Sequence, residues 1–301
     1  MNGGRVPKTT RLKRLIADPK LLIMPGAYDP ISARVAEAGG FDAIQCSGFA
    51  ISGAHLGLPD YSFLSMQEMV ERTRCIAGAV GIPVMADGDT GFGNAVNAYY
   101  AVQAFERAGA AGVNLEDQVM PKRCGHLEGK SVLSFDEAVM KVRAAADARV
   151  DKDFVINART DALAVEGMEE VIRRGNAFLE VGATMIFVHG VASRSDIKAA
   201  VAGIKGPVAI NLVEGGKSPL DIKVNELEAL GVARVSLPVT LFSSAIRGMQ
   251  VALERLEKDG AVSPPGDLLI NFAEATALTG MPEVLALEKK YLVPLAIGAK
   301  R

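Results

Sequence analysis

Two aspartates in "MADGDTGFGN" carry the strongest chemical signal in this sequence of 301 residues. Asp87 and Asp89 stand two positions apart in an extended segment, so their side chains point to the same side. Two carboxylates that face one side repel each other unless a cation or a proton lies between them. One interpretation is a metal site. The other is a pair of Asx turns in a loop that Gly88, Gly91 and Gly93 favour.

Two further carboxylates extend this pair into an oxygen-rich set. Asp60 ends the segment "LGLPD", and Glu116 stands in "LEDQ". Carboxylate oxygens suit Mg²⁺ or Mn²⁺, which keep several waters when bound. A zinc site is not expected, because the three histidines are not paired on one helical face. A metal with open positions can hold the adjacent oxygens of a 2-oxo acid.

A second group of reactive side chains lies in "EDQVMPKRCGHLEGK", residues 116 to 130. Basic neighbours of Cys124 lower the pKa of a thiol and stabilise its thiolate. Because glycine flanks the segment, we expect a mobile lid that excludes water when it closes. The alternative is an incidental thiol on a solvated basic loop. A disulfide scaffold is not expected, since Cys46, Cys75 and Cys124 form no CxxC pair.

Eight apolar, strand-like runs recur along the chain and alternate with segments of helical period. This alternation is typical of parallel strands covered by helices. An open doubly wound sheet would show the same alternation, but the length of the repeat favours a closed (β/α)₈ TIM barrel. The runs begin at Leu21, Phe41, Ile82, Ala111, Asp153, Thr184, Pro207 and Val232.

Active sites of such barrels gather at the carboxyl ends of the strands. Polar residues occur at or just after the ends of different predicted strands, and we therefore expect them to share one pocket. These residues are Ser47, Asp87, Asp89, Glu116, Arg159, His189 and Asn211.

A Pro-Pro-Gly break after the eighth repeat separates a helical tail. It predicts a barrel domain over residues 1–262 and a C-terminal helical extension over residues 263–301. The apolar positions of the tail need a partner surface, which predicts oligomerisation.

Bulk composition favours a cytoplasmic enzyme that acts on a small molecule. The 33 Lys and Arg residues nearly balance 35 Asp and Glu residues, so nucleic acid is not an expected partner. No apolar run approaches the roughly 20 residues that span a bilayer. The N-terminal segment has basic residues but no apolar core of the signal-peptide kind.

Several motifs together resemble the isocitrate lyase and phosphoenolpyruvate mutase superfamily. The resemblance runs through nearly the whole chain, and the chain length is similar to that of the 2-methylisocitrate lyase and 2,3-dimethylmalate lyase branch. It implies a TIM barrel whose C-terminal helices are swapped between the subunits of a homotetramer. The motifs are "SGFAIS" (47–52), "LGLPD" (56–60), "DGDTGFG" (87–93), "LEDQ" (115–118), "KRCGH" (122–126), "ARTDA" (158–162) and "NLVEGGKSP" (211–219).

The resemblance also implies a role for individual residues. Asp87 and Asp89 would approach Mg²⁺, with Asp60 and Glu116 acting mainly through its waters. Arg159 would bind a carboxylate, which its planar fork suits. The catalytic set would be Cys124 as proton donor, Lys122 and Arg159, within a lid formed by residues 122–126. Substrate contacts would come from Tyr28, Ser47, Gly48, Gly125, His126, Arg159, His189 and Asn211.

The implied activity is that of a Mg²⁺-dependent carbon–carbon lyase. It would cleave a 2-hydroxy di- or tricarboxylate to pyruvate or a related 2-oxo acid plus a carboxylate. The enediolate formed would be stabilised by Lys122, Arg123 and His126 and protonated by Cys124. Alternatives are a phosphonate-forming mutase, similar to carboxyphosphonoenolpyruvate mutase, and an oxaloacetate hydrolase or decarboxylase. A barrel that serves only as a binding protein would not need all these side chains at once.

Two residues keep more than one interpretation. Where many lyases of this branch have an acidic residue in "F-x-E", this chain reads "FVHG", with His189 at the end of strand six. The imidazole would bind a substrate carboxylate, act as acid or base, or hydrogen-bond Arg159, or it would only support the structure. Tyr28 either contacts a substrate oxygen or is a buried tyrosine with a satisfied hydroxyl.

Overall fold

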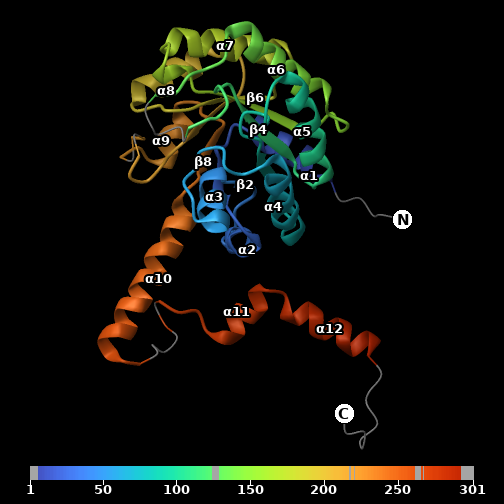
Figure 1. Cartoon of the computed structure of the whole chain (residues 1–301), viewed down its shortest axis with the longest axis vertical. Coiled ribbons are helices and arrows are strands. Elements are labelled where there is room, and N and C mark those ends of the chain that lie inside the picture. Colours follow the sequence, from blue (N-terminus) through green and yellow to red (C-terminus); the bar gives the residue numbers. More distant parts are fainter. Residues whose placement is uncertain are drawn as a thin grey trace, which may run out of the picture. The chain divides into compact units, whose positions relative to one another are not determined.

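The computed structural model describes residues 6–123, 129–216, 218–219, 221–261, 266 and 268–292. Within them, parallel strands β1 to β8 pair in sequence order and close into a barrel (Figure 1). Each predicted run contains one strand, so the predicted (β/α)₈ barrel is confirmed. The strands are β1 (Leu22–Ala27), β2 (Ile44–Cys46), β3 (Val84–Asp87), β4 (Gly112–Glu116), β5 (Val155–Thr160), β6 (Met185–Val188), β7 (Val208–Asn211) and β8 (Arg234–Leu237).

Helices surround the barrel and cover the outer faces of its strands (Figure 1). Several begin at side-chain caps that the sequence provides. The Ser65 hydroxyl accepts from the backbone N–H of Glu68, for example, and the Glu68 carboxylate accepts from the backbone N–H of Ser65. The helices of the barrel are α1 (Lys8–Ala17), α2 (Pro30–Ala38), α3 (Gly48–Leu56), α4 (Met66–Ala79), α5 (Ala95–Arg107), α6 (Phe135–Asp147), 3₁₀ helix η1 (Ala162–Ala164), α7 (Met168–Glu180), α8 (Arg194–Gly203) and α9 (Val224–Ala229).

Apolar side chains fill the N-terminal half of the barrel interior. Leu12 and Ile16 of α1 are buried in one cluster with Leu22, Met85 and other inward-facing strand residues. Helix α1 therefore closes the N-terminal end of the barrel. A separate and larger apolar cluster lies between the strands and the outer helices. The polar side chains of the barrel interior lie at the carboxyl ends of the strands, where the active site of such a barrel is expected.

The chain divides into two compact units, Met1–Ser243 and Ser244–Arg301. The division falls within α10 (Thr240–Asp259), whereas the sequence predicts a boundary between residues 262 and 263, which stays a prediction. The second unit also contains α11 (Phe272–Leu278) and α12 (Met281–Tyr291). No described helix is both long and apolar enough to cross a membrane.

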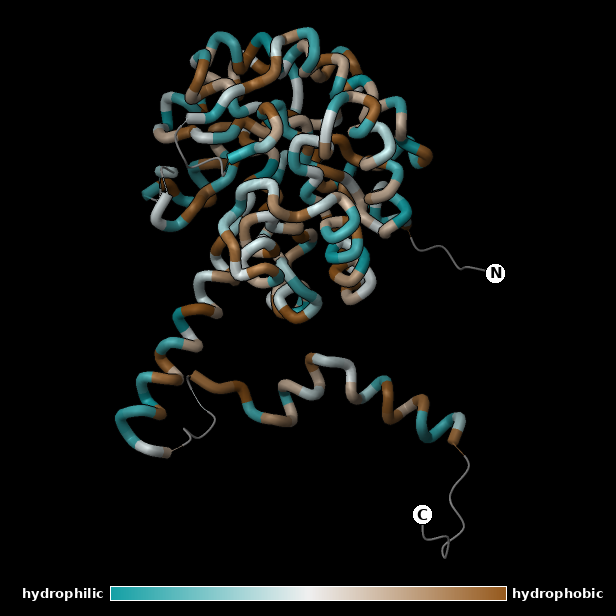
Figure 2. The backbone as a smooth tube through the Cα atoms, viewed as in Figure 1, coloured by the Kyte–Doolittle hydropathy of each residue, from teal (hydrophilic) through white to brown (hydrophobic). Residues whose placement is uncertain are grey.

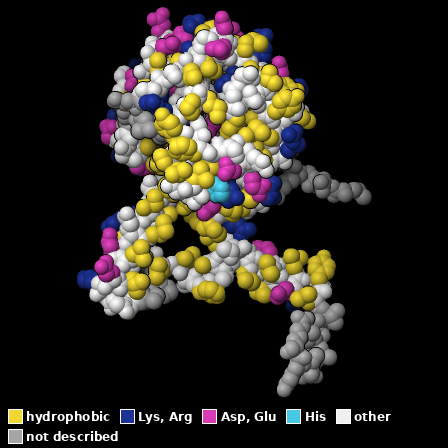
Figure 3. Space-filling model, in the orientation of Figure 1, with side chains coloured by type: hydrophobic (Ala, Val, Ile, Leu, Met, Phe, Trp, Pro, Cys, Tyr) yellow, Lys and Arg dark blue, Asp and Glu magenta, His cyan; other side chains and the backbone are white. Residues whose placement is uncertain are grey.

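The described helices of the second unit have no buried residues. Hydrophobic and hydrophilic positions alternate along α10 and α12 (Figure 2), and apolar side chains gather on the surfaces of these helices (Figure 3). Among the exposed ones on α10 are Ile246, Met249, Leu253 and Leu256. Their spacing of three or four residues places them along one helical face.

Candidate active site

One pocket at the carboxyl ends of the strands collects most of the predicted site residues, although Arg123 of the predicted lid does not line it. Its volume is about 260 Å³, which suits a small organic acid. Tyr28 is not among its lining residues; its ring packs edge-on against Phe242, with centroids 5.4 Å apart. Cys124, Gly125 and His126 lie outside the described residues. The predicted residues that line the pocket are Ser47, Gly48, Asp60, Asp87, Asp89, Glu116, Lys122, Arg159, His189 and Asn211.

Asp87, the last residue of β3, is held by two backbone N–H groups. Its Oδ2 accepts from Gly48 at 2.9 Å and its Oδ1 accepts from Asp89 at 3.1 Å. A Cβ atom at position 48 would lie only 2.5 Å from Asp87 Oδ2, so any other residue there would displace this carboxylate. Ser47 caps the N-terminus of α3, which directs the positive end of the helix dipole toward this carboxylate.

Asp89 lies in the loop after β3 in an unusual backbone conformation. Its φ of 47° is in the left-handed region, which aspartate tolerates better than most residues but which still stores strain. The ammonium group of Lys141 on α6 supports this loop by donating to the carbonyl of Thr90 at 2.7 Å. Burial raises the pKa of Asp89 to about 6, against the opposing charge of Lys122.

Lys122 joins the predicted lid to the carboxylate cluster. Its buried Nζ lies 2.8 Å from Asp60 and 2.8 Å from Asp89. Burial alone would lower the pKa of Lys122, but the charges of Asp89 and Asp60 raise it well above its usual value. The backbone N–H of Lys122 also donates to Ser62 Oγ at 2.9 Å. The start of the lid is therefore fixed to the loop that carries Asp60.

Arg159, at the end of β5, lies between two carboxylates. Its Nη1 is 2.8 Å from Glu116 Oε2, while Nε and Nη2 donate to the two oxygens of Asp161 at 2.8 and 3.1 Å. Burial raises the pKa of Glu116 to about 8, although the charge of Arg159 opposes this. Burial alone would lower the pKa of Arg159, but the charges of Asp161 and Glu116 raise it, so Arg159 stays charged.

Asp161 organises the wall that contains His189. Its Oδ1 lies 3.3 Å from His189 Nδ1 and accepts from Lys130 Nζ at 2.9 Å. Burial alone would raise the pKa of Asp161, but the charges of Arg159, His189 and Lys130 hold it well below its usual value. The other ring nitrogen, Nε2, lies 3.3 Å from Asn211 Nδ2.

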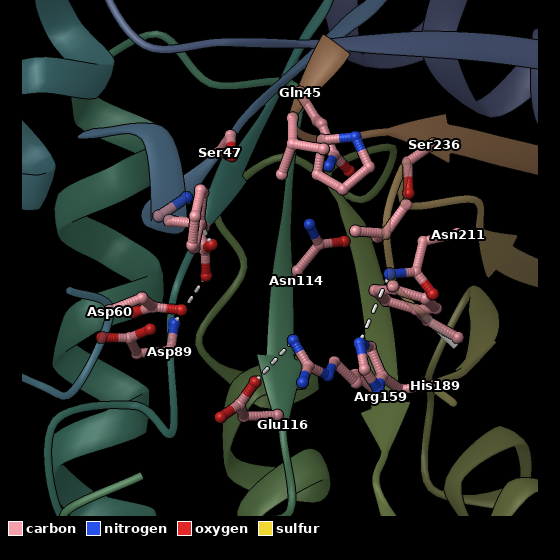
Figure 4. Close-up of a pocket in the computed structure, with 18 of the residues that line it drawn as sticks. Gln45, Ser47, Asp60, Asp89, Asn114, Glu116, Arg159, His189, Asn211 and Ser236 are labelled. Atoms are coloured by element: carbon pink, nitrogen blue, oxygen red, sulfur yellow. Dashed lines mark hydrogen bonds and ion pairs between the residues drawn. The ribbon is translucent and has the colours of Figure 1, made fainter. Parts of the chain in front are cut away.

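The labelled residues occupy opposite sides of the pocket (Figure 4). Asp60 and Asp89 lie on one side, His189 and Asn211 lie on the other, and Glu116 lies between them. The pocket thus has an acidic wall and a wall that carries hydrogen-bond donors. Such a division suits a metal at one end of an anionic substrate and direct contacts at the other.

The acidic wall fits a divalent metal that keeps waters. Asp89 Oδ1 and Glu116 Oε1 are buried and have no assigned hydrogen bond within the described residues, although the ammonium of Lys122 lies 2.8 Å from the first. Among the described residues, no three His, Cys, Asp or Glu side chains are placed to enclose an ion by themselves. Mg²⁺ is usually bound through one or two carboxylates, so this arrangement fits Mg²⁺. Asp87 and Asp89 would hold it, with Asp60 and Glu116 nearby.

Sequence reasoning missed the residues at the floor of the pocket, which we define as Gln45, Asn114 and Phe187. Each precedes a predicted site residue by two positions, and alternate residues of a strand face the same side. The period of the strands would therefore have identified them. Asp161 was also missed, although it follows Arg159 by two positions.

Comparisons with known proteins agree with this fold. The family model described as phosphoenolpyruvate phosphomutase matches residues 12–257. The chain is 41% identical over 281 residues to 2,3-dimethylmalate lyase of Eubacterium barkeri, covering 93% of this chain and 97% of that protein.

Two solved structures are similar to nearly the whole chain. Oxaloacetate acetylhydrolase in complex with 3,3-difluorooxalacetate has a TM-score of 0.91 at 33% identity, covering 97% of this chain and 100% of that one. Phosphonopyruvate hydrolase in complex with oxalate and Mg²⁺ has a TM-score of 0.86 at 34% identity, covering 96% and 100%.

Proposed function

This chain belongs to the phosphoenolpyruvate phosphomutase family, and from that premise we propose that it is a Mg²⁺-dependent carbon–carbon lyase. Its substrate is a 2-hydroxy di- or tricarboxylate of the 2,3-dimethylmalate or 2-methylisocitrate type. The products are pyruvate or a related 2-oxo acid and a second carboxylate. The identity to 2,3-dimethylmalate lyase over nearly the full length supports this class of reaction.

One observation carries the proposal: buried carboxylates and a buried arginine meet in a single pocket. Asp87, Asp89 and Glu116 supply hard oxygen ligands, and Arg159 lies 2.8 Å from Glu116. When bound there, Mg²⁺ supplies a Lewis acid and a template for the oxygens of a 2-hydroxy acid. A guanidinium is suited to bind the planar carboxylate of the same substrate.

The side chains of the pocket have separate tasks in this reaction. Loss of the hydroxyl proton to a base and cleavage of the carbon–carbon bond together turn the hydroxyl carbon into a 2-oxo group and leave the bonding electrons on the other fragment as an enediolate. The ammonium of Lys122 stabilises that negative charge. Cys124 donates the proton that turns the enediolate into the product carboxylate, and its thiolate is stabilised by the basic residues beside it.

Arg159 is oriented before substrate arrives. Asp161 holds one edge of its guanidinium through two hydrogen bonds, so that the cation does not have to be ordered on binding. His189, whose ring nitrogens lie 3.3 Å from Asp161 and 3.3 Å from Asn211, lines the pocket as a further substrate contact. The donor-bearing wall thus binds the carboxylates that the metal does not.

Turnover of a substrate panel tests the proposal. Purified protein with Mg²⁺ is incubated with 2,3-dimethylmalate, 2-methylisocitrate, oxaloacetate and phosphonopyruvate, and 2-oxo acid is followed by coupled lactate dehydrogenase, with NMR for other products. We expect cleavage of a hydroxy acid and a large loss of rate in Cys124→Ser. Absence of turnover with every hydroxy acid would refute the lyase, and full activity of Cys124→Ser would refute the proton donor.

Oxaloacetate hydrolysis is the second candidate. The overall similarity to oxaloacetate acetylhydrolase favours it, as does a pocket floor that contains two amide side chains, Gln45 and Asn114. In the same panel, formation of oxalate and acetate from oxaloacetate, with no cleavage of hydroxy acids, would identify this activity instead.

A further inference from the structure

Arg234, the first residue of β8, is a cation buried inside the barrel among neutral partners. Its side chain is 0% exposed. Nε donates to Met24 Sδ at 3.1 Å, Nη2 donates to Gln45 Oε1, and Nη1 has no hydrogen-bond partner among the residues that the structure describes. The ring of Phe187 lies 5.6 Å from the guanidinium carbon. Within the described part of the chain, no carboxylate forms an ion pair with it.

Arg174 shows how this chain accommodates a buried arginine that serves the fold. It is as deeply buried as Arg234, but its nitrogens lie 3.2, 3.0 and 2.8 Å from Asp117, Glu166 and Glu170. A buried charge without such partners destabilises a protein. Packing alone therefore does not account for Arg234, and unsatisfied groups of this kind occur at functional sites.

Arg234 fixes the orientation of an amide that lines the pocket. A guanidinium only donates hydrogen bonds, so the carbonyl oxygen of Gln45 must face it. The Gln45 Nε2 group is then left for the pocket (Figure 4). Because β2 pairs with β3 at Gln45 and Met85, this amide lies two residues deeper in the barrel than Asp87.

Asn114 repeats this arrangement beside it. Its Oδ1 accepts from Asn157 Nδ2 at 2.6 Å, so its Nδ2 group is also left for the pocket that it lines. Both amides of the floor thus direct their oxygens to partners inside the barrel and their N–H groups to the cavity. Such a surface offers hydrogen-bond donors to an oxygen atom of the ligand. If a methyl group lies there instead, the donors stay unpaired and the ligand binds more weakly.

We propose that Gln45, Asn114 and Arg234 form a second polar subsite, which binds an oxygen-bearing group of the substrate that points into the barrel. Gln45 and Asn114 contact that group. Arg234 is a positioning residue, since it holds the Gln45 amide and places a positive charge behind it. The inference rests on the proposed function and narrows it: the group at the floor is a carboxylate or a hydroxyl, not an alkyl substituent.

The charges around the pocket agree with this assignment. Five carboxylates line the cavity, and the lining cations Lys122 and Arg159 are already paired with three of them. A polyanionic substrate therefore needs positive charge from elsewhere. Arg159 and Arg234 both lie near the ring of Phe187, with guanidinium carbons 5.5 and 5.6 Å from its centroid. In this dry interior the charge of Arg234 acts over a longer range than it would in water.

The test compares three ligands that differ in the group on the carbonyl carbon next to a shared carboxylate: pyruvate has a methyl, hydroxypyruvate a hydroxymethyl, and oxalate the charged oxygen of its second carboxylate. Their affinities for the full chain with Mg²⁺ are measured by titration calorimetry. We expect the wild type to prefer hydroxypyruvate or oxalate to pyruvate. In Gln45→Leu and Arg234→Met this preference should fall roughly tenfold to hundredfold, the range for a hydrogen bond to a charged group. Arg234→Lys should restore part of it.

Two outcomes overturn the subsite: a wild type that prefers pyruvate, or variants that weaken all three ligands equally. The second would assign Arg234 a purely structural role. The double variant Gln45→Leu/Arg234→Met replaces the polar pair with apolar side chains and leaves neither partner unsatisfied, so it serves if a single variant fails to fold. Loss of preference in the folded double variant supports the proposal, and retained preference refutes it.

Binding is measured without turnover, which separates this inference from the proposed function. If the wild type cleaves no hydroxy acid, and Gln45→Leu lowers the preference for oxygenated ligands, the subsite is supported and the proposed lyase activity is refuted. The two oxygenated ligands distinguish the chemistry of the group at the floor. If Gln45→Leu weakens the binding of oxalate alone, that group is a carboxylate. If it weakens the binding of hydroxypyruvate alone, the group is a hydroxyl.

Discussion

Asp161 is the residue on which the donor-bearing wall of the pocket depends. It contacts Arg159, His189 and Lys130, which come from three different segments of the chain. Sequence analysis identified Arg159 and His189 from their places at strand ends. It could not identify their shared carboxylate, because residues 130, 159 and 189 meet only when the barrel closes.

Asp161→Asn is therefore expected to change how stability depends on pH. The pKa of Asp161 is lowered from 3.8 in the folded protein, so its contribution to stability is fully present above pH 3.8. Below that pH the unfolded chain takes up a proton before the folded one does, and the contribution is lost. At neutral pH the variant should lose roughly 3 to 5 kcal/mol, as expected when one partner of a buried ion pair is removed.

The measurement is urea unfolding at pH 7 and at several pH values below 3.8. The stability of the wild type should fall more steeply with acid than that of Asp161→Asn. Asp42→Asn, at an exposed aspartate, is the matched control and should follow the wild type. Parallel acid profiles for wild type and Asp161→Asn would contradict the assignment of this carboxylate.

At the scale of elements, the strands could be predicted and some helices could not. Each strand carries an apolar period, and the eight together imply parallel pairing. Helix α1 has only ten residues, and its buried positions Leu12 and Ile16 stand among charged ones. Its role comes from the barrel end that it fills, which no local pattern indicates.

Gly48 lies in the turn from β2 into α3, and we expect Gly48→Ala to weaken Mg²⁺ binding. The new Cβ would lie 2.5 Å from Asp87 Oδ2, so the carboxylate must move. We expect Mg²⁺ affinity by calorimetry to fall at least about tenfold, in the range of losses seen when groups that orient metal ligands are changed. Gly78→Ala in α4 is the control, because nothing lies within 4 Å of its Cβ. Unchanged Mg²⁺ affinity in Gly48→Ala would remove Asp87 from the metal site.

We expect a substitution in the buried face of helix α1 to lower the stability of the protein without changing the metal site. Leu12→Ala leaves a cavity in the apolar end of the barrel and should lower the free energy of unfolding by roughly 2 to 5 kcal/mol. Mg²⁺ affinity should stay as in the wild type, because the polar end is untouched. Arg14→Ala, at an exposed position of the same helix, should be neutral. A similar loss in both variants would show that α1 contributes through its surface and not through this contact.

At the scale of the whole molecule, the second unit has apolar faces that its own described residues do not bury. We propose that they pack against further copies of this chain in a homotetramer. The stripe formed by Ile246, Met249, Leu253 and Leu256 supports this, since Leu253 is 65% exposed and Met249 59%. Sequence alone indicated a need for partners through the apolar tail. The exposed stripe on α10 could not be predicted from the sequence, because the helical pattern of this segment is the one expected for the last helix of the barrel.

Light scattering of two variants tests the assembly. For Leu253→Glu and for a chain that ends at residue 262, the assembly in solution should contain fewer copies of the chain than the wild-type assembly, because each change removes apolar contact area. Glu257→Ala, at an exposed polar position of α10, is the control and should keep the mass of the full chain. Unchanged mass in both test variants would exclude the second unit from the interface.

The closed N-terminal end of the barrel has a kinetic consequence. Leu12 and Ile16 fill the interior there, so we expect both products to leave at the carboxyl ends of the strands, where the substrate enters. The fragment nearest the floor is then the last to depart. Such a sequence predicts that this product inhibits competitively against substrate, whereas the product released first inhibits noncompetitively. Initial-rate measurements with each product would show which half of the substrate is the deeper one.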